Sequence, residues 1–137
     1  EDSDEAQRKK QARVVSGFVK KTLSADPKVG VIVLGDMNAG KRFPATSVAD
    51  AMGVIRGQET SDPLDDLVDL NGNLPADQRK SHVGGKELDR ILLSGALLDN
   101  VGLVFRQVVI RHDLVTDDES DHFPMIATFT YRATMGP

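Results

Sequence analysis

Apolar side chains recur at helical spacing in the first part of the chain, and Asp26-Pro27 ends the pattern. The spacing predicts one amphipathic helix before this stop, with its apolar stripe facing a core. The stripe consists of Ala12, Val15, Val19 and Leu23, and Val14 and Phe18 widen it.

Four later segments have the pattern of strands. Residues 29–34 are apolar at every position except Gly30, which predicts an inner strand covered on both faces. Residues 88–93, 101–110 and 124–131 are the other three, and a short helix is expected at 47–52 within a long loop. One N-terminal helix followed by several strands and long loops predicts a layered α/β fold.

Composition narrows the possible functions. A chain of 137 residues is one domain or part of one, and 28% charged with 39% hydrophobic residues is typical of globular proteins. The net charge of −4 lacks the basic excess of a sequence-blind nucleic-acid binder. The chain has no cysteine, which excludes disulfides and thiolate chemistry. No transmembrane helix is expected, because no apolar run approaches the required length of about 18 residues.

The strongest chemical signal is Asp121-His122 at the entrance to the last strand, where a carboxylate and an imidazole are adjacent. A second candidate site follows the strand at 29–34. Alternation along a strand places Asp36 and Asn38 on the same side at its C-terminal end. There Asp36 could activate water or a metal-bound water, and Asn38 could bind a phosphate oxygen without adding charge. The alternative is that this Asp-x-Asn simply opens a turn.

Asp89 lies among apolar residues of a predicted strand and needs a hydrogen-bond partner if it is buried. Arg90 points to the opposite face, so His122 is the better partner, although a salt bridge to another arginine is an alternative. An Asp-His pair raises the pKa of the imidazole and favours its protonated form near a phosphate. Asp121 is then placed to bind a divalent cation. A hard cation such as Mg²⁺ prefers oxygen ligands, and the absence of cysteine argues against a zinc cage.

Residues 35–41 match most of a phosphate-binding P-loop, but Arg42 stands where Ser or Thr is needed. Phe43-Pro44 also opposes the helix that should follow. The P-loop interpretation is therefore rejected.

Three motifs in this order resemble those of the endonuclease/exonuclease/phosphatase superfamily of Mg²⁺-dependent phosphoesterases, which includes DNase I-like nucleases. Gly-Asp-Met-Asn at 35–38 is similar to the family's Gly-Asp-Phe-Asn, and 88–94 is similar to its Asp-centred strand. Ser-Asp-His at 120–122 is similar to the closing motif, and 8–15 resembles the helix before the Gly-Asp strand.

The resemblance implies part of a four-layered α/β/β/α sandwich with mixed, mostly antiparallel sheets. It implies a metal-dependent phosphoric ester hydrolase that uses Mg²⁺ or Mn²⁺. His122 would contact the scissile phosphate or transfer a proton, and Asp89 would orient it. Asp36 would position the attacking water and contribute to the metal site with Asp121, and Asn38 would bind phosphate.

The family domain is about twice as long as this chain, so residues 1–137 resemble its C-terminal half. We expect this half to pair with a missing N-terminal half or to self-associate. The expected substrate is a phosphoester, and nucleic acid is one candidate. The missing half normally supplies further metal ligands and a second catalytic histidine. His82 and His112 are expected at the surface. The alternatives are a non-catalytic fragment or binding module that retains the motifs, and a structural interaction domain.

Overall fold

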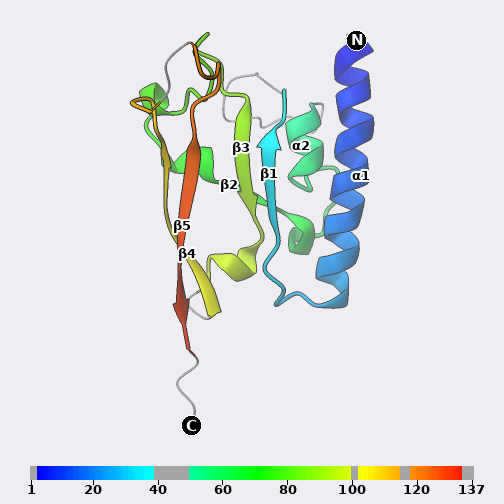
Figure 1. The fold of residues 1–137 in the computed structure, drawn as a ribbon. Coiled ribbons are helices and arrows are strands. Elements are labelled where there is room, and N and C mark those ends of the chain that lie inside the picture. Colours follow the sequence, from blue (N-terminus) through cyan, green and yellow to red (C-terminus); the bar gives the residue numbers. More distant parts are fainter. Residues whose placement is uncertain (1–2, 39–49, 100–101, 115–117, 134–137) are drawn as a thin grey trace.

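The computed structural model describes residues 3–38, 50–99, 102–114 and 118–133. These residues form two helices and five strands, joined by loops and short 3-10 turns (Figure 1). The helices are α1 (Ser3–Ala25) and α2 (Ala51–Ile55); the strands are β1 (Ile32–Asp36), β2 (Val68–Asp69), β3 (Asp89–Leu93), β4 (Gly102–Ile110) and β5 (Met125–Arg132).

Every strand pair in the described part of the chain is antiparallel. The strand order in one sheet is β1-β3-β2, so β3 is central, and β4 pairs with β5 in a second sheet. The protein is therefore of the α/β class, as the sequence pattern predicted, and its described sheets are antiparallel. The described elements do not by themselves form the four-layered sandwich that the family resemblance implies.

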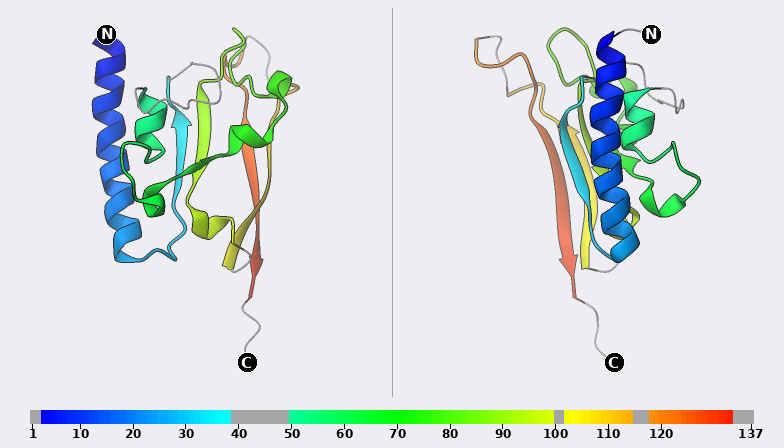
Figure 2. Two further views of the ribbon diagram at one scale, coloured as in Figure 1. Left: turned by 180° about the vertical axis from the view of Figure 1, so that it is seen from behind. Right: turned by 90° about the vertical axis from the view of Figure 1, so that its right-hand side faces the viewer.

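Two hydrophobic clusters hold the elements together, one on each face of β3. Leu92 faces the helices, whereas Ile91 and Leu93 face β4 and β5. The two helices and the β4–β5 pair accordingly lie on opposite sides of the three-stranded sheet (Figures 1 and 2). The helix-side cluster includes Ala12, Val19, Leu23, Met52, Val54 and Ile55; the other includes Leu70, Leu74, Leu97, Val108 and Ile110.

Helix α1 confirms the predicted N-terminal helix, which ends just before Asp26. Its apolar stripe is narrower than expected. Val14 and Phe18 are 74% and 69% exposed, because the helix contacts α2 and the turn after it along one side only. Both side chains remain on the uncovered side of α1.

The prediction that the first strand is an inner strand is wrong for the described residues. β1 is an edge strand, and its exposure alternates. Val33 packs toward the helices, whereas Ile32 and Leu34 are 39% and 67% exposed on the other face. The β4–β5 pair covers β3 on that face but does not cover β1. The apolar run therefore marks a strand whose second face is left uncovered by the described residues.

The remaining predicted elements are found with shifted ends. β3, β4 and β5 confirm the three later strands. The short helix expected at 47–52 corresponds to α2, but residues 47–49 lie outside the described part of the chain. None of the described helices is both long and apolar enough to cross a lipid bilayer.

Candidate functional site

The register of β1 against β3 brings two of the predicted site residues together. Asp36 is paired with Asp89, and Leu34 with Ile91. Directly paired residues project from the same face of a sheet, so both carboxylates lie on the face of Leu34 and Ile91, which β4 and β5 cover at β3 but not at β1. Like charges opposite one another are unfavourable, so this pair requires a cation or a hydrogen-bond donor nearby.

His122 supplies that donor. It lies just before β5, and its Nδ1 is 2.7 Å from Oδ2 of Asp89. Because an ionised carboxylate can only accept, Nδ1 carries the hydrogen and Nε2 is left facing outward. Nε2 lies 3.9 Å from Oδ2 of Asp36 and 3.9 Å from Oδ1 of Asp121. The hydrogen bond to Asp89 raises the pKa of His122, and the charges of Asp121 and Asp36 act in the same direction.

The main chain around Asp89 is fixed from both sides. The hydroxyl of Ser81, which is fully buried, accepts the N–H groups of Leu88 at 3.0 Å and Asp89 at 2.9 Å. The amide of Asn71 donates to the carbonyl of Asp89. The carbonyl of Ser81 also accepts the N–H of Phe123, next to His122, at 2.8 Å. Ser81 thus links the two segments that carry the Asp-His pair.

Arg90 is not the partner of Asp89. It lies on the opposite face, as expected, and is buried with its guanidinium 3.3 Å from Asp69. Burial raises the pKa of Asp69, and the charge of Arg90 opposes this effect. Among the described residues, the partner of Asp89 is His122, and the expected hydrogen bond between them is present.

The chain after β1 forms a tight turn around Asp36. Its Oδ1 accepts the N–H of Asn38 at 2.8 Å, and Asn38 has a left-handed φ of 47°. The strand alternation that was expected to place Asp36 and Asn38 on the same side therefore ends at Asp36. The alternative, that this Asp-x-Asn opens a turn, describes the backbone. Gly35 has a φ of 146°, which an L-residue rarely adopts. Backbone geometry thus accounts for both the glycine and the asparagine of this motif.

His82 belongs to the site, although the sequence analysis placed it at the surface. Its side chain is 21% exposed, and its ring meets that of His122 edge to face at 5.1 Å. Its Nε2 lies 3.4 Å from Oδ2 of Asp121, a side chain that is 70% exposed. The backbones of His82 and His122 form an isolated bridge, a long-range pairing that no local sequence signal indicates. His112 is exposed, as expected, and packs on Phe123.

The ligand atoms of His82, Asp121 and His122 lie within 4.8 Å of one another, so this group could hold a metal ion. Asp36 lies beside the group through its contact with His122. Among the predicted site residues, Asp36, Asp89, Asp121 and His122 converge, whereas Asn38 joins them only through its backbone.

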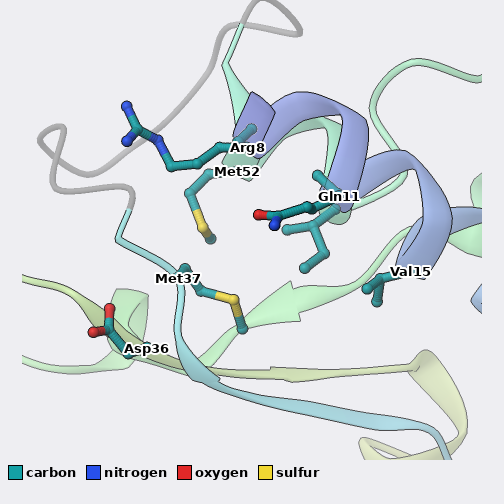
Figure 3. Close-up of a pocket in the computed structure, with 9 residues that line it drawn as sticks. Arg8, Gln11, Val15, Asp36, Met37 and Met52 are labelled. Atoms are coloured by element: carbon teal, nitrogen blue, oxygen red, sulfur yellow. The ribbon is translucent and has the colours of Figure 1, made fainter. Parts of the chain in front are cut away.

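Hollows lie on both faces of β1 near its C-terminal end. A groove of about 380 Å³ exposes Asp89 and His122 between Leu34 and Met125, and it forms the open side of the site. A smaller cavity of about 150 Å³ lies between β1 and the helices (Figure 3). Met37 lines this cavity together with Val15 and Met52 and packs against the helix-side cluster, which anchors the end of β1 beside Asp36.

No protein-family model, curated protein or solved structure matches this chain.

Proposed function

We propose that this chain is the C-terminal half of a divalent-metal-dependent phosphoesterase domain of the endonuclease/exonuclease/phosphatase type. The observation that carries the proposal is the Asp89–His122–Asp36 arrangement, in which one imidazole joins two paired carboxylates at 2.7 and 3.9 Å. The chemistry that fits it is hydrolysis of a phosphoester by water.

His122 is the group that contacts the phosphate. Asp89 holds its Nδ1, so Nε2 is the atom presented to a substrate. The raised pKa of His122 increases the protonated fraction near neutral pH, where the ring can donate to a phosphate oxygen or protonate a leaving group. Asp89 acts through His122 and is a positioning residue.

Asp36 is the candidate for positioning or activating the attacking water. One of its oxygens is occupied by the N–H of Asn38, and the other is directed toward His122. The side-chain amide of Asn38 would bind a phosphate oxygen at the end of the turn. Both roles follow from the resemblance, and the contact between Asp36 and His122 supports the role of Asp36.

Asp36 and Asp121 are the proposed ligands of Mg²⁺ or Mn²⁺. Mg²⁺ is commonly held by one or two carboxylates and keeps several waters, which fits two carboxylates beside an open groove. When bound, such an ion would neutralise charge on the phosphate.

The uncovered face of β1 supports the half-domain proposal. Ile32 and Leu34 continue the apolar face of Ile91 and Leu93 beyond the edge of the β4–β5 pair. A missing N-terminal half that completes a four-layered α/β/β/α sandwich would cover this face, and self-association is the other way to bury it.

Hydrolysis of bis-p-nitrophenyl phosphate and plasmid DNA tests the proposal, with Mg²⁺ or Mn²⁺ and with EDTA. We expect little turnover by the chain alone and metal-dependent turnover once an N-terminal half is supplied. His122→Ala should abolish this turnover, whereas His112→Ala, which removes an exposed imidazole, should not. Absence of turnover in the completed domain would reject the proposal.

A non-catalytic binding module is the second candidate. It is favoured by the turn at residues 35–38, whose glycine and asparagine are explained by backbone conformation. Metal or phosphate binding without turnover in the completed domain would identify this function.

A further inference from the structure

The two histidines of the site have opposite hydrogen-bonding patterns. The N–H of Gly84 donates to Nδ1 of His82 at 2.8 Å, so this nitrogen must be unprotonated. In a neutral imidazole the hydrogen is then on Nε2. His122 instead carries a hydrogen on Nδ1, which it donates to Asp89. His82 therefore presents an N–H donor, 3.4 Å from Oδ2 of Asp121, beside the outward-facing nitrogen of His122.

The turn at residues 82–85 is shaped around the ring of His82. The N–H of Gly85 donates to the carbonyl of His82 at 2.8 Å, and the N–H of Val83 donates to the carbonyl of Asp121 at 2.9 Å. A Cβ at position 84 would lie 2.9 Å from Nδ1, so glycine is what allows the N–H to approach the ring this closely. The orientation of His82 is thus built into the backbone and tied to the segment that carries His122.

A fixed donor is useful at this place because its surroundings are acidic. Asp36 and Asp121 flank Nε2 of His122, and an incoming phosphate would be repelled without donors or a cation. Preoriented N–H groups stabilise an oxyanion without reorganising when it binds.

We propose that His82 is a further phosphate-contacting residue, which donates its Nε2–H to an anionic oxygen of the phosphoester beside His122. This inference rests on the proposed function. It also assigns His82 a different role from that of a metal ligand, because coordination through Nε2 would require the hydrogen to move to Nδ1 and the bond from Gly84 to break.

The test is ¹⁵N NMR of the full chain labelled at histidine, with His112 as the internal reference. We expect the Nε2–H tautomer for neutral His82. Titration with inorganic phosphate in the presence of Mg²⁺ should shift the ring signals of His82 and His122 but not those of His112. His82→Leu should weaken phosphate binding by roughly ten- to a hundredfold, the range expected for a hydrogen bond to a charged group. His82→Gln, which retains a donor, should recover most of the affinity.

An Nδ1–H tautomer in the free protein would overturn the inference, and so would a switch to that form on adding Zn²⁺, which would identify a metal ligand. Phosphate that shifts His122 alone would overturn it while leaving the proposed function intact. If phosphate shifts neither ring, the proposed phosphate site and this inference both fail.

Discussion

Ser81→Ala is the sharpest test of how the site is held together. The substitution removes the hydroxyl that accepts two backbone N–H groups, at 3.0 and 2.9 Å, in a fully buried position. Each buried donor left unpaired costs about 1–3 kcal/mol, so we expect the free energy of unfolding to fall by about 2–6 kcal/mol. For a chain of this size each kcal/mol lowers Tm by roughly 3–5 °C. Denaturant and thermal unfolding measure both quantities.

The matched control is Ser94→Ala, at the other end of β3. Ser94 is also buried, and its hydroxyl accepts the N–H of Val31 at 2.9 Å, so its loss should destabilise the fold by about 1–3 kcal/mol. Of these two serines, Ser81 is the one bonded to the backbone of Asp89, so Ser81→Ala and not Ser94→Ala should lower the pKa of His122, which NMR titration measures. An unchanged pKa of His122 in Ser81→Ala, or an equal decrease in Ser94→Ala, would contradict this role of Ser81.

Three further predictions concern the site and the uncovered face. Asp89→Asn should lower the pKa of His122, because the hydrogen bond to Asp89 is the main cause of its elevation. The raised pKa contributes its full stabilisation of the native protein below the unfolded pKa of 6.5, and this contribution is lost as pH rises through the folded pKa. The free energy of unfolding, measured across that pH range, should therefore decline less in Asp89→Asn than in the native protein. Asn38→Gly removes the side-chain amide, but glycine adopts the left-handed φ of 47° without strain, so Tm should be unchanged. Phosphate affinity, measured by calorimetry, should fall. An unchanged affinity would exclude the amide from the site. Leu34→Lys places a charge on the uncovered face and should reduce self-association in light scattering, whereas a monodisperse native monomer would contradict the self-association alternative.

Local sequence patterns determined most of the elements of this protein. The helical spacing before Asp26 gave α1, and the apolar runs gave β1 and β3 to β5 with small errors at their ends. The pairing of Asp89 with His122 was also predictable, since a carboxylate among strand hydrophobes needs a partner and His122 was the best candidate.

Only the tertiary structure decided which faces are covered and which distant residues meet. An apolar run has the same appearance in a covered strand as in an edge strand, so the exposure of Ile32 and Leu34 depends on where the β4–β5 pair lies. His82 meets His122 through a long-range backbone bridge, and its orientation depends on Gly84. Such contacts join segments far apart in the chain, and no periodicity or local motif encodes them.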